Sequence, residues 1–297
     1  MNAAPHLLEL RDLSVEFHTR DGVARVINGV SFHVDAGETL AVLGESGSGK
    51  SVTAQAIMGI LDMPPARIGG GQVLWQGQDL LTMAPEARRE LRGAAIAMVF
   101  QDSLSALNPV FPVGWQIAEA LRVRQGVPRA EAGRRAAELM DRVHIPAAKA
   151  RLDDYPHQFS GGMRQRVMIA MALALGPRLL IADEPTTALD VTVQAQIMDL
   201  LAELQRDTGM ALILITHDLG VVASVADRIA VMYAGRVVEQ ADVHALYERP
   251  AHPYTRALLD SIPRRYRHGQ PLRTIQGLPP NLLRIPQIGR ASCRERV

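Results

Sequence analysis

The sequence predicts an α/β fold with an inserted helical subdomain. Strand patterns with one helix run through residues 6–100, and composition then turns helical over about residues 102–175. Helix and strand patterns alternate through residues 161–235, which is typical of βαβ units around a parallel sheet. Two short strand patterns, Arg228–Tyr233 and Arg236–Gln240, predict a β-hairpin.

The composition is that of a globular protein rather than of a nucleic-acid-binding tail. The 297 residues are 47% hydrophobic with a formal net charge of +1, so no nucleic-acid partner is expected. The N-terminal segment Met1–Glu9 lacks the basic region and apolar core of a signal peptide. The longest apolar stretch, Val167–Leu175, is far shorter than the ~20 residues of a bilayer span. Together with a single cysteine, these features predict a soluble protein of the cytoplasm.

The most informative segment is Gly44–Ser51, which reads GESGSGKS and fits the phosphate-binding P-loop pattern G-x-x-x-x-G-K-[ST]. An apolar strand pattern, Thr39–Leu43, precedes it and a helical pattern, Val52–Met58, follows. The glycines let backbone N–H groups turn onto phosphate oxygens, and the helix N-terminus adds partial positive charge. Lys50 is expected to reach the β- and γ-phosphates of a nucleoside triphosphate, and the Ser51 hydroxyl to ligate Mg²⁺. The predicted nucleotide contacts are Gly44, Glu45, Ser46, Gly47, Ser48, Gly49, Lys50, Ser51 and Val52.

A second strand pattern ends in two carboxylates. Leu179–Ala182 is apolar and is followed directly by Asp183 and Glu184. Asp183 suits a contact with Mg²⁺, direct or through water, and Glu184 is placed to polarise an attacking water. The alternative is a buried strand followed by an acidic turn with no catalytic role. The P-loop earlier in the chain favours the functional interpretation.

A second anion-binding pattern follows the predicted helical subdomain. Ser160, Gly161 and Gly162 open a segment, Met163–Leu175, of helical composition. A serine N-cap followed by glycines at a helix start makes an anion site. A protein with one P-loop needs a second phosphate cradle if the γ-phosphate is held between two subunits. An ordinary capped helix is the alternative interpretation.

These segments together resemble the nucleotide-binding subunit of an ATP-binding-cassette (ABC) transporter, over roughly residues 6–287. The segment FSGGMRQR is similar to the LSGGQ signature of that family, with Phe159 and Met163 as departures. The resemblance implies a P-loop NTPase fold, whose core has a mixed β-sheet and is joined by an antiparallel β subdomain and an inserted helical subdomain. It also implies ATP and Mg²⁺ as cofactors, and ATP hydrolysis. It also implies a dimer, formed with a homologous ATPase subunit or with a second copy of the chain, and an ATPase domain that covers residues 6–245.

Three further residues match motifs of the family in the family's order. Gln101 matches the Q-loop glutamine, which implies a contact with Mg²⁺ or the attacking water. Asp190, in Ala188–Asp190, matches the D-loop aspartate and is expected near the nucleotide. His217 matches the switch histidine, whose imidazole is suited to bind the γ-phosphate and hold the water in line with Glu184. The alternatives are a surface glutamine and a structural histidine.

The residue that stacks on the adenine base is ambiguous in the sequence. Phe17 is the best match by pattern to the aromatic ring that the family places ahead of the P-loop. A strand residue that packs in the core is an equally good interpretation. The segment Thr19–Gly22 reads as a hairpin turn and makes the alignment ambiguous.

Three segments narrow the resemblance to the ATP-binding subunits of bacterial oligopeptide, dipeptide and nickel importers: 101–109, 249–259 and 278–282. The resemblance implies two membrane permease subunits and an extracytoplasmic solute-binding protein as partners, and a location at the cytoplasmic face of the inner or plasma membrane. The first segment corresponds to the place where the permease docks. A soluble ABC ATPase that acts outside transport is the alternative.

The C-terminal region differs in composition from the rest of the chain. Residues 246–287 are rich in proline and basic residues and form the predicted importer-type extension. Residues 288–297 match the translation of a sequencing adaptor, ATC GGA AGA GCG TCG TGT AGG GAA AGA GTG, so we interpret them as read-through. One cysteine cannot supply a four-thiolate iron–sulfur site. The histidines form no metal-ligand spacing, and no zinc site is expected.

Overall fold

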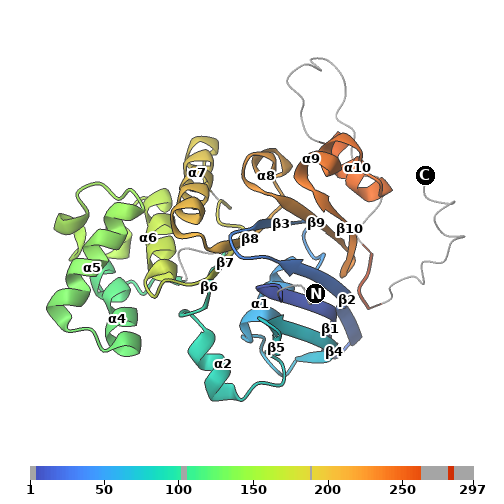
Figure 1. The fold of residues 1–297 in the computed structure, drawn as a ribbon, viewed down its shortest axis with the longest axis horizontal. Helices are drawn as coiled ribbons and strands as arrows, with labels where there is room; N and C mark the ends of the chain where they lie inside the picture. The colour runs from blue at the N-terminus through green and yellow to red at the C-terminus, as the bar shows by residue number, and fades with distance from the viewer. Residues whose placement is uncertain (1–4, 102–105, 188, 262–279, 284–297) are drawn as a thin grey trace, which may run out of the picture.

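Two β-sheets and a group of helices form the fold of the computed structural model, which describes residues 5–101, 106–187, 189–261 and 280–283 (Figure 1). The predicted α/β class, with its mixed sheet, antiparallel β subdomain and helical insertion, is confirmed. The domain boundaries remain a prediction.

The central sheet has six strands in the order β10-β9-β3-β8-β7-β6. Its neighbours are parallel except for β10, which pairs antiparallel with β9 through the predicted hairpin. The sheet is therefore mixed. The bounds are β3 (Thr39–Leu43), β6 (Ile96–Val99), β7 (Leu179–Asp183), β8 (Ala211–Thr216), β9 (Arg228–Tyr233) and β10 (Arg236–Asp242).

The second sheet is antiparallel and has four strands in the order β2-β1-β4-β5. Strands β1 and β2 are joined by the predicted turn, since Thr19 pairs with Gly22. The bounds are β1 (Leu8–Thr19), β2 (Gly22–Val34), β4 (Ala66–Trp75) and β5 (Gln78–Asp79).

The core lies on both faces of the central sheet. Side chains of β3 alternate between two buried clusters: Ala41 and Leu43 face the cluster that includes α6 and α7, whereas Leu40 and Val42 face the cluster that includes α1 and the antiparallel sheet. Burial on both faces explains why the central strands read as continuous apolar runs.

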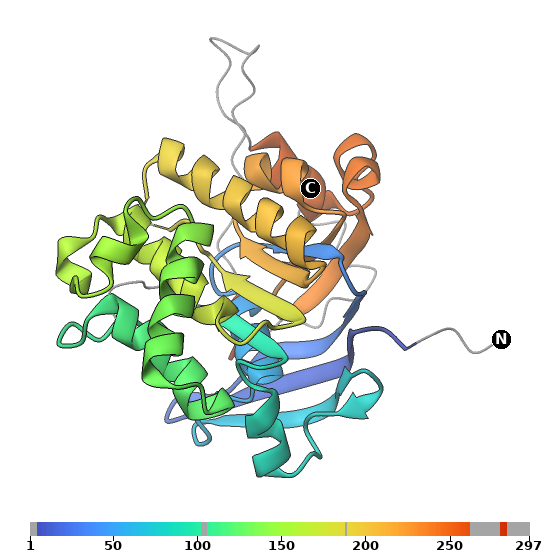
Figure 2. The ribbon, with the colours of Figure 1, turned by 60° about the vertical axis from the view of Figure 1, so that its left-hand side comes forward.

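Three helices, α4 (Val113–Gln125), α5 (Arg129–Arg142) and α6 (Gly161–Leu173), pack together beside the central sheet (Figure 2). Helix α6 begins before the predicted Met163 because Ser160 caps it, as its Oγ accepts a hydrogen bond from the Met163 N–H at 3.4 Å. Both glycines of the signature therefore lie in the first turn of α6.

The remaining helices cover the sheets and carry the chain into the extension. Their bounds are α1 (Lys50–Met58), α2 (Pro85–Leu91), α7 (Val191–Thr208), α8 (Leu219–Val225), α9 (Val243–Glu248) and α10 (Pro253–Asp260). Two short 3₁₀ helices span Ala148–Arg151 and Pro156–Gln158. Within the described ranges, none of the helices has both the length and the apolar character that a bilayer crossing requires.

Candidate active site

A cavity of about 580 Å³ lies at the carboxyl ends of the parallel strands. The P-loop follows β3 and forms its floor, while Gln101, Glu184 and His217 follow β6, β7 and β8. The carboxyl ends of parallel strands meet at one edge of a sheet, so four segments far apart in the chain converge here. The structure thus brings together the predicted phosphate-binding and catalytic residues.

The backbone of the P-loop adopts conformations that require glycine. Gly44 has a φ of 153°, and a Cβ on it would lie 2.2 Å from the Met232 carbonyl oxygen. Gly49 has a φ of 101° and caps α1, and a Cβ there would lie 2.7 Å from the Val26 carbonyl oxygen. These glycines let the loop turn tightly between β3 and α1, with the α1 N-terminus directed at the cavity.

The side chain of Lys50 is hydrogen-bonded to the backbone of the P-loop. Its buried Nζ donates hydrogen bonds to the carbonyl oxygens of Gly44 at 2.7 Å and of Glu45 at 3.0 Å. Burial lowers the pKa of this ammonium, and the nearby carboxylates of Glu184 and Asp183 act in the opposite direction. An anion in the cavity would offset the same desolvation.

Ser51 and Asp183 form an oxygen pair suited to Mg²⁺. Ser51 Oγ donates to Asp183 Oδ1 at 3.0 Å. Neighbouring oxygens around an octahedral Mg²⁺ with bonds of ~2.1 Å lie about 3 Å apart, so the two side chains fit adjacent positions on the ion. Asp183 is only 4% exposed, and burial raises the pKa of its carboxyl against the hydrogen bond from Ser51, which lowers it. A divalent cation would favour the ionised carboxylate.

Three side chains converge on the Glu184 carboxylate. Gln101 Nε2 donates to Glu184 Oε2 at 2.8 Å, and His217 Nδ1 lies 3.5 Å from Glu184 Oε1. Thr187 Oγ1 also donates to Glu184 Oε2, at 2.9 Å. No sequence pattern indicated Thr187, because only the turn after β7 brings its hydroxyl back to the carboxylate.

The turn after β7 fixes the direction of Glu184. Its φ of 46° lies in the left-handed region, which is uncommon for residues other than glycine. Its backbone N–H donates to the Ile215 carbonyl at 2.8 Å, which ties the turn to β8. Strained backbone of this kind clusters at functional sites, and here it aims the carboxylate into the cavity.

The signature residues lie elsewhere. Ser160, Gly161 and Gly162 are not among the described residues that line the P-loop cavity, and neither is Asp190. Asp190 Oδ1 caps α7 by accepting from the Val193 N–H at 3.0 Å. A Cβ on Gly162 would lie 2.5 Å from Val193 Cγ1, so the starts of α6 and α7 pack closely. These residues form a second group, built on two adjacent helix N-termini.

Phe17 is also absent from the described lining of the cavity. It is half-buried on β1, pairs with Ala24 and Ala66, and packs against the cluster under the antiparallel sheet. The contacts therefore favour its interpretation as a packing residue, while a role at the adenine remains a prediction. The apolar side chains in the described lining are those of Val26, Val52 and Leu282, and no sequence pattern had indicated Val26 or Leu282.

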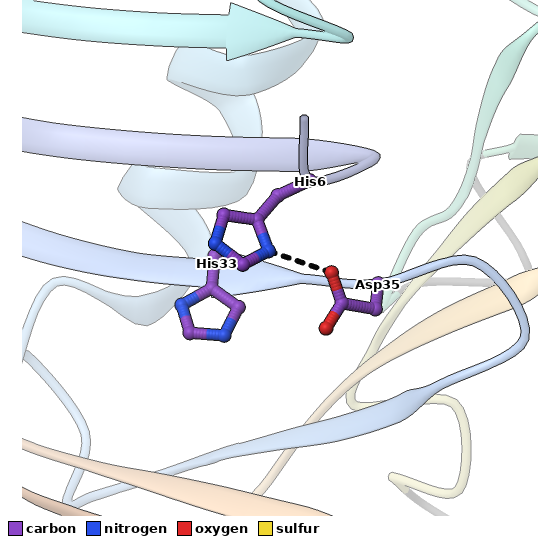
Figure 3. A group of neighbouring side chains, drawn as sticks. All are labelled: His6, His33 and Asp35. Atoms are coloured by element: carbon purple, nitrogen blue, oxygen red, sulfur yellow. Dashed lines mark hydrogen bonds and ion pairs between the residues drawn. The ribbon is translucent and has the colours of Figure 1, made fainter. Parts of the chain in front are cut away.

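A separate group of potential metal ligands comprises His6, His33 and Asp35 (Figure 3). The two imidazoles are stacked with centroids 3.9 Å apart and an interplanar angle of 23°, and His6 Nδ1 lies 2.6 Å from Asp35 Oδ1. A metal lies in the plane of each imidazole that ligates it, and stacked planes do not converge on one point.

The His33 environment also disfavours a cation. Its Nε2 lies 3.0 Å from the Arg228 guanidinium, and burial, with Arg228 as the next cause, lowers the pKa of His33. Arg228 is paired in turn with Glu38 at 2.7 Å. We interpret the group as a hydrogen-bonded cluster that joins the segment before β1 to β2 and β9, and the expectation of no zinc site remains a prediction.

The P-loop cavity and the fold define an ATPase of the ABC class, and comparison with known proteins gives its family. The model of the ABC transporter family matches residues 27–187, and that of the oligopeptide/dipeptide transporter C-terminal region matches residues 238–294. The chain belongs to the ABC transporter family, as a subunit that binds ATP. Subunits of this family dimerise and work with membrane permeases.

Curated relatives match almost the whole chain. The oligopeptide transport ATP-binding protein OppD of Bacillus subtilis is 51% identical over 282 residues, which cover 95% of this chain and 79% of the relative. The dipeptide transport ATP-binding protein DppD of Escherichia coli is 51% identical over 274 residues, which cover 92% of this chain and 84% of the relative.

Solved structures share the fold. The dimeric post-hydrolysis state of the ATP-binding cassette MJ0796 bound to ADP and Pi has a TM-score of 0.71 at 26% identity, over 80% of this chain and 98% of that chain. The cbiO1 protein of Clostridium perfringens, part of the ABC transporter complex cbiONQ, has a TM-score of 0.70 at 29% identity, over 82% of this chain and 92% of that chain.

Proposed function

We propose that the chain is the ATP-hydrolysing subunit of a bacterial ABC importer that takes up di- and oligopeptides, or nickel or related small solutes, through partner permeases. The observation that carries the hydrolytic role is the Glu184 carboxylate beside the P-loop, contacted by Gln101 and His217. The peptide class is supported by the match over residues 238–294 and by the names of the OppD and DppD relatives.

In this proposal the described residues divide the work of ATP hydrolysis. Lys50 and the P-loop backbone hold the phosphates, and Ser51 and Asp183 hold Mg²⁺, with the Gln101 amide as a further candidate ligand. Glu184 accepts the proton of the attacking water, and His217 keeps the water and the γ-phosphate in line. Thr187 and Gln101 position the carboxylate through their hydrogen bonds.

We also propose that two ATPase subunits enclose the nucleotide. The signature residues Ser160–Gly162 begin α6 but do not line the cavity of their own chain among its described residues. A helix N-terminus with two glycines exposes backbone N–H groups that suit a phosphate. The P-loop of one subunit would then face the signature of the other, with Asp190 at the same junction. The dimeric state in which the MJ0796 cassette was solved supports this arrangement.

We further propose that an apolar groove receives the permease. A hollow of about 350 Å³ between the central sheet and the helical group is lined largely by methionine and other apolar side chains, including Met98, Phe100, Met168 and Met171. Gln101 directly follows Phe100, so an apolar helix of a permease seated there would contact the segment that bears a catalytic candidate. The neighbouring residues 102–105, part of the predicted docking segment, lie outside the described residues.

The remaining parts of the proposal follow from this role. Two permease subunits would span the membrane, an extracytoplasmic solute-binding protein would deliver the cargo, and the chain would sit at the cytoplasmic face of the inner or plasma membrane. No nucleic-acid partner is proposed. A soluble ABC ATPase that acts outside transport remains the alternative.

Reconstitution with the permease subunits tests the proposal. Addition of peptide and binding protein to proteoliposomes should stimulate ATP hydrolysis and peptide uptake together. Met171→Glu in the groove should remove the stimulation and keep basal hydrolysis, whereas Val123→Glu, at a residue of α4 that is 73% exposed, should change neither. A rate of ATP hydrolysis that is the same with and without the permeases would favour the soluble ABC ATPase instead.

A further inference from the structure

A short segment of the C-terminal extension, Pro280–Leu283, lies at the nucleotide cavity (red in Figure 1). Leu282 lines the cavity, and its carbonyl accepts a hydrogen bond from the backbone N–H of Arg25 in β2 at 3.2 Å. Asn281 Oδ1 accepts from the Leu283 N–H at 2.9 Å, which holds the segment in a local turn. The contact thus joins a residue near the start of the chain to one near its end.

The stretch of β2 that receives this segment is also tied to the P-loop. The backbone N–H of Asn28 donates to the Gly235 carbonyl at 2.8 Å, and the Gly235 N–H donates to the Ser48 carbonyl at 3.0 Å. Val26, between Arg25 and Asn28, therefore lies in a backbone network with the P-loop on one side and Leu282 on the other. Its side chain lines the cavity as well.

The lining of the cavity combines polar and apolar side chains. Lys50 and Ser51 mark the place of the phosphates, and Gln101, Glu184 and His217 adjoin it. Among the described lining residues the apolar side chains are Val26, Val52 and Leu282. Val52 belongs to α1 next to Ser51. Val26 and Leu282 lie instead where β2 is hydrogen-bonded to the turn between β9 and β10. In the central sheet that turn is on one side of β3, and the strands that precede the catalytic candidates, β6, β7 and β8, are on the other.

We propose that Leu282 and Val26 form the slot for the purine base of ATP, so that the extension supplies one wall of the nucleotide site. This inference rests on the proposed binding of ATP at the P-loop. A purine offers flat apolar faces, and aliphatic side chains that remove those faces from water stabilise the complex. Leu282 is half-buried, so part of its surface is free to gain such a contact.

The slot would account for how the cavity holds the base without an aromatic ring. The described lining of the cavity lacks an aromatic ring for the base, because Phe17 packs against the cluster under the antiparallel sheet. A docked aliphatic segment takes over that wall. Base binding would then hold the Pro280–Leu283 segment on β2, and the extension would be coupled to nucleotide occupancy.

Nucleotide affinity in matched variants tests the slot. Leu282→Ala should weaken ATP binding by roughly tenfold, because it removes most of one apolar wall, and should leave the affinity for inorganic tripolyphosphate unchanged. Leu283→Ala is the matched control: this leucine is 38% exposed and outside the cavity lining, so ATP affinity should be kept. Lys50→Ala should weaken the binding of both anions.

The outcomes separate the two levels of the proposal. Unchanged ATP affinity in Leu282→Ala, with Lys50→Ala weakened, overturns the slot and leaves the ATP site standing. Tighter binding in Leu282→Ala also overturns it, because the segment would then be a plug that competes with the nucleotide. If Lys50→Ala weakens neither anion, the proposed ATP site fails and the slot fails with it.

Thiol protection supplies a second measurement that does not depend on affinity. The single cysteine, Cys293, is replaced by serine, and Leu282→Cys is introduced. Saturating ATP should slow alkylation of the new thiol at least about fivefold, whereas saturating tripolyphosphate should not. Equal alkylation rates with ATP and tripolyphosphate would overturn the slot.

Discussion

The phenol of Tyr254 accepts a hydrogen bond from the backbone N–H of Glu45 in the P-loop, at 3.0 Å. Tyr254 belongs to α10 of the C-terminal extension and is only 8% exposed, and its ring packs on that of Tyr233 with centroids 4.5 Å apart. Burial raises the pKa of Tyr254 to about 12, so the phenol is neutral at physiological pH. The extension thus contacts the phosphate-binding loop directly.

Tyr254→Phe is expected to lower both stability and nucleotide affinity. The change leaves the Glu45 N–H without its partner at a cost of about 1 kcal/mol, which corresponds to a melting temperature lower by roughly 2–4 °C. If the same ~1 kcal/mol is lost from the binding-competent conformation of the P-loop, ATP affinity should fall about fivefold. Tyr247→Phe is the control, because this half-buried phenol donates to the Leu219 carbonyl instead. It should lower the melting temperature but not the affinity; equal affinity losses in both variants would contradict a specific role of Tyr254.

Lys50→Ala and Glu184→Gln should separate binding from turnover. Loss of the Lys50 ammonium removes a charge-assisted hydrogen bond to phosphate and should weaken ATP binding by roughly 10- to 100-fold. Glu184→Gln removes only the group that acts on water, so binding should persist while kcat falls by about 10²- to 10⁴-fold. Lys149→Ala, at an exposed position, and Glu203→Gln, at a partly exposed one, are the matched controls. An equal loss of binding in both test variants would refute the assignment of Glu184 as base.

The dimer is expected to form around ATP when hydrolysis is blocked. Glu184→Gln with Mg²⁺ and ATP should sediment as a dimer, with its natural partner if the working pair is a heterodimer. Adding Gly161→Asp should restore the monomer, because the new carboxylate would repel the γ-phosphate of the other subunit. Gly133→Asp on α5 is the control and should leave the dimer intact. A dimer that survives Gly161→Asp would place the signature outside the interface.

Asp183→Asn should stabilise the nucleotide-free protein while it impairs Mg²⁺ binding. The pKa of Asp183 is raised in the folded state, so the stability due to its proton is present below the unfolded pKa and is lost as the pH rises through the folded pKa. At neutral pH the buried charge is a burden that the amide removes, and the melting temperature should rise. The gain should vanish below about pH 4, the ordinary range of Asp. In calorimetry with ATP, the variant should lose the Mg²⁺ dependence of affinity.

The exposed Asp207→Asn on α7 serves as control for that experiment and should change neither melting temperature nor Mg²⁺ dependence. A lower melting temperature in Asp183→Asn would show that the hydrogen bond from Ser51 outweighs the desolvation of the carboxylate.

Removal of residues 288–297 is expected to leave the melting temperature and ATP hydrolysis unchanged. The segment lies outside the described residues, and its match to a sequencing adaptor gives no reason for it to pack. A loss of several degrees would mean that it contributes to the fold, since ~1 kcal/mol shifts a domain of this size by about 2–4 °C.

Functional residues that are consecutive in the chain could be predicted from local sequence pattern alone. Glycine spacing and the flanking patterns predicted the P-loop, and the apolar run before Asp183 predicted a strand that ends at the site. The Ser160 cap follows from the residue type at a helix start, and the structure confirms it. Convergence of these strand ends follows from a parallel sheet, so much of the site was predictable before any coordinates.

The sequence by itself determined the class of fold, the P-loop and the order of the motifs, because each depends on a few neighbouring residues. Only the tertiary structure decided that Thr187 reaches Glu184, that Tyr254 holds the P-loop and that Leu282 joins Val26 in the lining of the cavity. It also decided that Phe17 packs under the antiparallel sheet. The physical reason is that these contacts join segments whose relative placement depends on turn geometry, strand register and the packing of the whole core, none of which leaves a local pattern in the chain.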